Sequence, residues 1–182
     1  MEQVQKSVLR EYLEAIVIAI VLALFIMAFV ARSFSVEGSS MVPTLHNGER
    51  LLVDEISYRF IQPSRGEIIV FRYPANPSAR FIKRVIGLPK DTIVVREGKV
   101  FLNGEPLEED YLGEPIYGEF GPYVVPPGTV FVLGDNRNNS EDSRFPLVGY
   151  VPRSYVVGRA IFRFWPLTRI GPIHKPAIFS NK

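Results

Sequence analysis

The N-terminal end of the chain carries one long apolar run. From Ala15 to Ala31 no side chain is charged or strongly polar, and Leu13 lengthens the run on its N-terminal side. A helix that crosses a hydrocarbon core needs about 20 consecutive, mainly apolar residues. We therefore expect a single transmembrane helix over residues 13–31, preceded by a short cytoplasmic segment over residues 1–12.

Two other interpretations of this run fit the residues less well. A cleaved signal peptide has an apolar core of about 7–15 residues that ends in a small-x-small site, but this core is longer and Phe29 follows Ala28 near its end. A buried core helix normally carries a polar stripe, which this run lacks. Lys6 and Arg10 precede the run and Arg32 follows it, a weak bias toward a cytoplasmic N-terminus. The following domain would then lie on the extracytoplasmic face.

After residue 32 the pattern changes to short β-branched and aromatic runs separated by Gly, Pro and Asn, which is typical of β-strands. This pattern predicts a mainly β fold, an antiparallel sheet or partly closed barrel, over residues 32–94 and 126–170. Residues 95–125 are rich in Glu and Asp and are predicted to form a small inserted hairpin with an acidic loop. Residues 171–182 are expected to form a loosely held C-terminal tail.

Composition removes several classes of function. The chain has no cysteine, which excludes disulfide scaffolds, thiolate metal sites and a cysteine nucleophile. It has two histidines, which argues against a multi-histidine zinc site, so we expect neither a metal nor a cofactor. The formal net charge is +2 with the arginines scattered along the chain, which argues against nucleic acid as a partner.

Ser40 is a candidate nucleophile close to the apolar run, but a serine needs an adjacent general base. His46 fits a solvated loop and His174 lies in the Pro-flanked tail, so neither supports a Ser-His-Asp triad. The G-x-S-x-G pattern fails because Val42 stands at the second glycine, and no lysine lies three residues after a serine.

Lys83 is the better candidate for the base. The strand period of two puts it on one face with Phe81 and Val85. Apolar neighbours desolvate an ammonium, lower its pKa and favour the neutral amine that a base must be. On this strand alone, an inward-pointing lysine that protects a sheet edge from aggregation is the favoured interpretation.

A polar segment over residues 134–144 follows the apolar strand 130–133 and is dense in Asp, Asn, Ser and Arg. A long surface turn would use the same residue types. Its pairing capacity exceeds what a turn requires, however, and such a loop can orient a catalytic amine.

Four segments in this order resemble the conserved boxes of bacterial type I signal peptidases, the leader peptidase family with a Ser-Lys dyad. The segments are Gly38–Thr44, Arg65–Phe71, Phe81–Pro89 and Gly134–Arg144. The resemblance covers most of the chain except the acidic insert and the tail, and the small insert and single anchor look like the compact Gram-positive-type forms. It implies a membrane-anchored serine endopeptidase that removes N-terminal signal peptides after a small-x-small motif.

The resemblance also implies roles for single residues. Ser40 would be the nucleophile, with its backbone N–H donating to the oxyanion, and Lys83 the general base. Ser140 would orient the lysine amine, and two ion pairs beside the site would be Asp142 with Arg144 and Arg84 with Asp135. Side chains lining the substrate pockets would be Val36, Met41, Leu45, Phe81 and Ile82, each of which ordinary core packing would also explain.

Two positions depart from the family pattern. Gly38 stands where some members carry a serine that donates to the oxyanion, so one donor is unaccounted for. Asn138 stands where many members carry Asp, which changes the charge of the loop.

The resemblance further implies partners and a location. The partners would be the signal peptides of exported preproteins and the lipid bilayer, with the secretion translocon as a further candidate, and the location the bacterial plasma membrane. An alternative is a dedicated Ser-Lys peptidase for one secreted, pilus or conjugation precursor, or a relative from an organelle membrane, and the sequence does not separate it from a general signal peptidase. An anchored β-domain that binds exported peptides without cleaving them is a third, which the combination of Ser40, Lys83 and Ser140 argues against.

Overall fold

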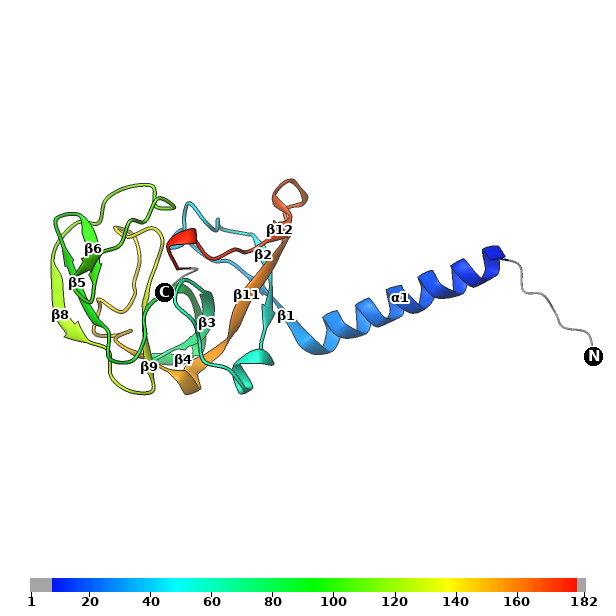
Figure 1. The fold of residues 1–182 in the computed structure, drawn as a ribbon, viewed down its shortest axis with the longest axis horizontal. Coiled ribbons are helices and arrows are strands. Elements are labelled where there is room, and N and C mark those ends of the chain that lie inside the picture. The colour runs from blue at the N-terminus through cyan, green and yellow to red at the C-terminus, as the bar shows by residue number, and fades with distance from the viewer. Residues whose placement is uncertain (1–7, 180–182) are drawn as a thin grey trace, which may run out of the picture.

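The computed structural model describes residues 8–179, without the side chains of residue 9 and residues 23–31. Helix α1 (Val8–Val30) projects away from a β-rich body (Figure 1). In the described part of the chain, no helix combines the length and the apolar composition that a membrane crossing needs. The predicted span 13–31 extends into residues 23–31, whose side chains lie outside the described set.

The body is mainly antiparallel β-structure, as the sequence pattern predicts. Within the described residues its larger sheet has eight strands, in the order β1-β2-β11-β3-β4-β9-β10 with β12 paired to β11. Their bounds are β1 Ala31–Ser35, β2 Arg50–Asp54, β3 Ile68–Tyr73, β4 Asn76–Gly87, β9 Thr129–Leu133, β10 Val151–Pro152, β11 Val156–Trp165 and β12 Gly171–Pro172. Because β1 pairs only with β2 in this order, one edge of β1 is left open.

The second sheet accounts for the insert. It has four strands in the order β7-β6-β5-β8 within the described chain. Their bounds are β5 Thr92–Arg96, β6 Lys99–Leu102, β7 Glu105–Pro106 and β8 Phe120–Val124. The sheet thus begins at Thr92, three residues before the predicted boundary of the insert at residue 95. Its two central strands, β5 and β6, form a hairpin that turns at Glu97 and Gly98.

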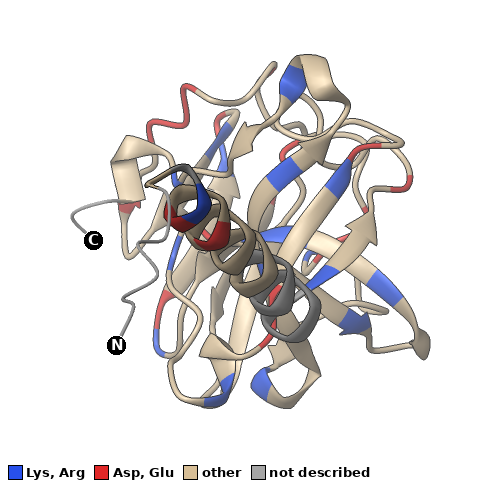
Figure 2. Ribbon diagram, turned by 90° about the vertical axis from the view of Figure 1, so that its right-hand side faces the viewer, with Lys and Arg blue, Asp and Glu red and all other residues tan. Residues whose placement is uncertain are grey.

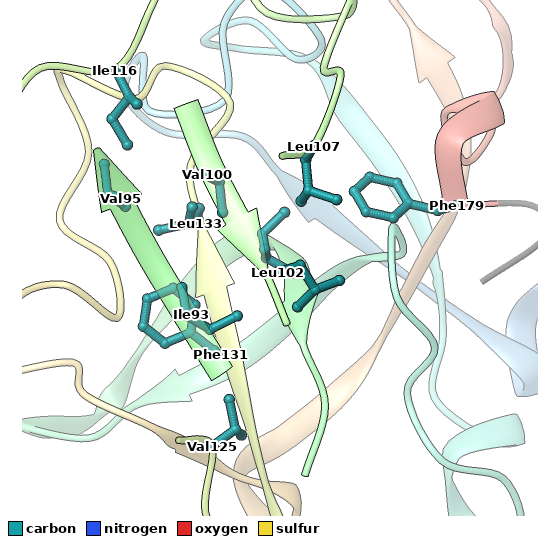
Figure 3. Packing of buried hydrophobic residues seen from close by; sticks show 11 residues of the cluster. Ile93, Val95, Val100, Leu102, Leu107, Ile116, Val125, Phe131, Leu133 and Phe179 are labelled. Carbon is teal, nitrogen blue, oxygen red and sulfur yellow. The ribbon is translucent and has the colours of Figure 1, made fainter. Parts of the chain in front are cut away.

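One core cluster joins the two sheets (Figure 3). Ile93 and Val100 of the second sheet pack with Phe131 and Leu133 of β9, and all four side chains are fully buried. Such burial is the main favourable contribution to folding. The insert is therefore packed onto the main sheet by a shared core.

The expectation of a loosely held tail is wrong for the described part of the C-terminal segment, which ends at Phe179. This side chain is 2% exposed and belongs to the shared core, where Leu107 also lies (Figure 3). Gly66 makes room for it, since a Cβ there would lie 2.7 Å from the Phe179 ring. Sequence reasoning missed this because a single aromatic residue in a Pro-rich end carries no periodic signal.

Charged residues are spread rather than gathered. In the view of Figure 2, Lys and Arg positions fall on several strands, with Asp and Glu between them. This agrees with the small formal net charge of +2.

Candidate active site

Ser40 lies in a tight turn that follows β1. The N–H of Val42 donates to the Ser39 carbonyl at 3.1 Å, and the N–H of Leu45 donates to the Met41 carbonyl at 2.8 Å. Met41 and Leu45 are buried, at 2% and 0% exposure, and so anchor the turn in the core of the main sheet. The turn holds Ser40 at the end of the open edge of β1.

Lys83 reaches Ser40 from β4. Its Nζ lies 2.9 Å from the Ser40 Oγ and 3.1 Å from the Ile82 carbonyl oxygen. Nζ also lies over the Phe81 ring, 5.1 Å from its centroid. The structure therefore brings together the two residues predicted as nucleophile and base, which are 43 positions apart in the sequence.

The Lys83 amine is tuned toward its neutral form. The residue is 4% exposed, and burial lowers the pKa of Lys83 from 10.5 to about 8, against the opposing charges of Asp142, Glu141 and Asp135. Burial acts in this direction because it disfavours the charged form of an amine. At pH 8 about half of the amine is then neutral.

The polar loop 134–144 is built around a buried carboxylate. Asp142 is 0% exposed, and Arg144 donates to both of its oxygens, at 2.8 Å and 2.9 Å. The N–H of Gly134 donates to the Asp142 Oδ2 at 3.1 Å and closes the loop on itself. The predicted Asp142–Arg144 pair is thus formed, and it fixes the loop that carries Ser140.

A second buried pair joins three segments of the site. Arg84 donates to both Asp135 oxygens, at 2.8 Å and 2.6 Å, and both side chains are at most 1% exposed. The Thr44 hydroxyl donates to the same carboxylate at 2.6 Å. The pair predicted as Arg84 and Asp135 therefore ties the turn of Ser40, strand β4 and the polar loop together.

Ser140 lies beside the turn of the nucleophile but makes no hydrogen bond to the base. Its Oγ is buried and has no hydrogen-bond partner within the described residues. It packs against Gly134, where a Cβ would lie 2.5 Å from the Ser140 Cβ and would also collide with the Ser40 carbonyl oxygen. The predicted hydrogen bond from Ser140 to Lys83 is not formed in this structure.

A groove of about 770 Å³ runs beside Ser40 between β1 and β4. Four of the residues predicted to line the substrate pockets, Val36, Met41, Phe81 and Ile82, line this groove. Leu45 is not among the lining residues and instead packs in the core cluster below, so its prediction as a pocket residue is not supported. Further lining residues that the prediction did not include are Ser33, Phe34, Ser35, Glu37, Ser39, Arg80, Asn139 and Glu141.

Two asparagines of the polar loop hold the backbone of the nucleophile turn. The N–H of Asn136 donates to the Ser40 carbonyl at 3.0 Å and its side chain donates to the Ser39 carbonyl at 3.1 Å. Asn139 donates to the Ser39 hydroxyl at 3.0 Å. The sequence signal for these contacts was the density of amide side chains in the loop.

The insert also contacts the polar loop. Arg137 is 1% exposed and donates to both oxygens of Glu109, at 2.6 Å and 2.7 Å. Asn138 donates to the Pro115 carbonyl at 2.9 Å and accepts from the Tyr117 N–H at 2.8 Å. An Asp at 138 could accept but not donate, which gives a physical reason for the Asn at this position.

These features define a class of protein. It is a mainly antiparallel β-protein in which a serine hydroxyl and a buried lysine amine share a hydrogen bond in an open groove. A hydroxyl beside a base of suitable pKa is the arrangement that acyl transfer requires.

The family model described as "Signal peptidase, peptidase S26" matches residues 9–165, and the chain belongs to this family. The resemblance to type I signal peptidases is thereby confirmed. A protein named signal peptidase I from Leptolyngbya laminosa is 49% identical over 178 residues, which cover 93% of this chain and 86% of that protein.

Two further proteins are similar to this chain. A signal peptidase I from Bacillus licheniformis is 40% identical over 176 residues, covering 91% of this chain and 94% of that protein. The crystal structure of a signal peptidase I from Enterococcus faecalis V583 is 37% identical, covers 54% of this chain and 97% of that chain, and has a TM-score of 0.48.

Proposed function

We propose that this peptidase cuts with a dyad of Ser40 and Lys83 while a membrane helix anchors it. Family membership makes the chain a serine endopeptidase that removes signal peptides from preproteins. What we add is the identity of the catalytic residues and the presence of a membrane anchor. The observation that carries it is the 2.9 Å distance from the Lys83 Nζ to the Ser40 Oγ.

The mechanism follows from the protonation state of Lys83. The neutral amine takes the proton of Ser40 as Oγ attacks the carbonyl carbon of the scissile peptide bond. The lysine then gives the proton to the leaving amine, and an ester joins Oγ to the signal peptide. Water, deprotonated by the same amine, hydrolyses the ester and frees Ser40.

Two groups beside the dyad have supporting roles in this proposal. The backbone N–H of Ser40 donates to the oxyanion, while Gly38 has no side chain to add a donor. The Ser140 hydroxyl is buried without a partner within the described residues, and an unpaired buried hydroxyl costs about 1–3 kcal/mol. We assign it to the Lys83 amine when substrate fills the groove.

The groove suits an extended peptide. A strand added along the open edge of β1 would place alternate side chains on the same wall. Val36, Met41, Phe81 and Ile82 make this wall apolar, so shallow pockets would accept small residues at positions −1 and −3. This matches the small-x-small cleavage signature of exported proteins.

The anchor is proposed from the apolar run and from the position of α1. Residues 15–31 contain no charged side chain, and α1 projects from the body (Figure 1). The catalytic body would lie on the extracytoplasmic face, where exported chains leave the bilayer. The test is membrane fractionation under alkaline wash: the full chain should stay with the membrane and a variant starting at residue 32 should not. Equal release of both would contradict the anchor.

The dyad is tested by cleavage of a precursor with purified protein in detergent. Ser40→Ala and Lys83→Ala should each abolish cleavage, because each removes a reacting group. Matched controls are Ser154→Ala, at an exposed serine, and Lys99→Ala, whose side chain is 48% exposed. Cleavage that survives Ser40→Ala or Lys83→Ala would refute the dyad. A precursor with a large residue at −1 that is cut normally would refute the pocket assignment.

A further inference from the structure

Tyr73, at the end of β3, links both sides of the groove next to Lys83. Its hydroxyl donates to the Glu141 Oε1 at 2.8 Å. Its ring stacks on Phe81, with centroids 4.3 Å apart and planes 8° from parallel. Tyr73 is thus joined at one end to the loop that carries Ser140 and at the other to the strand that carries Lys83.

Phe81 lies between Tyr73 and the amine. Residues 81 and 83 share one face of β4 because side chains alternate along a strand. Across the hairpin, Phe81 pairs with Phe71, so Tyr73 lies beyond it on the side away from Lys83. The Lys83 Nζ lies over the Phe81 ring at 5.1 Å, so this ring is part of what keeps water from the amine.

The Phe81 ring needs a support to stay in that place. It lines the groove and is half-buried, so one side faces solvent until substrate binds. Phe71 contacts it edge-on, with centroids 6.2 Å apart. The parallel face of Tyr73 is the closest aromatic contact that Phe81 has among the described residues. Without it, the Phe81 side chain could turn away from Lys83.

The charges near Lys83 are the other influence on its protonation. The polar loop contributes acidic groups and an arginine, β4 contributes two arginines, and the nucleophile turn contributes one glutamate. These groups are Asp135, Glu141, Asp142, Arg144, Arg80, Arg84 and Glu37. A substitution at Tyr73 changes none of these charges, although it releases the carboxylate of Glu141 from its hydroxyl partner.

We infer that Tyr73 is a positioning residue for the general base: its ring holds Phe81 against Lys83 and its hydroxyl holds Glu141 at the rim of the groove. The inference rests on the proposed function, because it concerns the amine that the dyad uses. Tyr73 is not itself a lining residue of the groove, and it acts on the Lys83 amine through Phe81, which is one.

The test is the pH dependence of kcat/KM for precursor cleavage, measured from about pH 6 to about pH 10, where its acid limb reports the base of the free enzyme. Tyr73→Leu removes the ring stack, so water reaches Lys83 and the acid limb moves to higher pH. Cleavage at pH 7 then falls about tenfold for each unit of the shift. At high pH, where the amine is neutral in both proteins, the variant recovers wild-type activity.

Two further variants separate the ring from the hydroxyl and from general packing. Tyr73→Phe keeps the stack and frees Glu141, so its acid limb should move less than that of Tyr73→Leu. Tyr155→Leu removes a half-buried tyrosine from the same core cluster without touching the groove, and its acid limb should stay in place.

Three outcomes overturn the inference: a Tyr73→Leu profile without a shift, an equal loss of activity at every pH, or an equal shift in Tyr73→Phe. Failure of the proposed function would look different. In that case Lys83→Ala would still cleave, or the wild type would show no acid limb. A wild-type limb that depends on Lys83 and does not move in Tyr73→Leu refutes the role of Tyr73 alone.

Discussion

Gly134→Ala should lower kcat about 10²-fold while leaving the protein folded. The added methyl group would lie 2.5 Å from the Ser140 Cβ and would collide with the Ser40 carbonyl oxygen. Ordinary contact begins at 3.4 Å, so one of the two segments must move by about 1 Å. A displacement of that size at a catalytic group lowers the rate about 10²-fold.

The measurement is kcat for precursor cleavage by purified protein in detergent, together with thermal unfolding. Gly113→Ala is the matched control, because a Cβ there meets nothing within 4 Å. We expect the control to keep wild-type kcat, and Gly134→Ala to lose about 10²-fold while still unfolding in one transition. A Gly134→Ala protein with kcat within a factor of about three of wild type would refute the close packing of the polar loop on the nucleophile turn.

Three further outcomes follow from the same structure. Wild-type kcat/KM should rise about tenfold per pH unit below pH 8 and then level off, since the neutral amine of Lys83, with a pKa of about 8, is the active form. An activity optimum at about pH 5 would contradict a lysine base. Asp135→Asn should lower the free energy of unfolding by about 3–5 kcal/mol in urea titrations, because it leaves the Arg84 charge buried and unpaired. The control Glu108→Gln, in an exposed pair with Lys99, should lower it by about 0–1 kcal/mol. Equal losses in the two variants would show that burial of the Arg84–Asp135 pair is immaterial. Phe179→Ala should cost about 3–5 kcal/mol by the same titration, with Phe60→Ala, at 80% exposure, as the near-neutral control; a neutral Phe179→Ala would mean that the C-terminal segment is not docked in solution.

The strands were predictable from the alternation of side chains, whereas the pairing of Ser40 with Lys83 was predicted from the resemblance to the peptidase family. Alternation along β4 puts Lys83 on the face of Phe81, and burial on that face gives a low pKa. The polar loop has more hydrogen-bonding groups than a turn needs. One predicted ion pair, Asp142 with Arg144, lies within the loop, and the other joins Asp135 of the loop to Arg84 of β4.

What sequence reasoning missed depends on contacts between distant segments. Leu45 packs into the core because the chain turns after Ser40, where the Leu45 N–H bonds the Met41 carbonyl. The residue types of the segment Gly38–Thr44 do not predict that turn. Phe179 reaches the core through a space that Gly66 leaves 113 positions earlier in the chain. The hydroxyl of Ser140 lies against Gly134 and makes no hydrogen bond with Lys83, which only the packing of the loop determines.

The docking of the insert has a consequence for motion. Arg137 and Asn138, which contact Glu109, Pro115 and Tyr117 of the insert, lie in the same loop as Asn136, which holds the Ser40 carbonyl. Segments that share buried contacts open together as one cooperative unit. Hydrogen exchange at the amides of residues 134–144 should therefore follow the exchange of the second sheet, and loosening the insert at a distance would slow cleavage without altering any group that reacts.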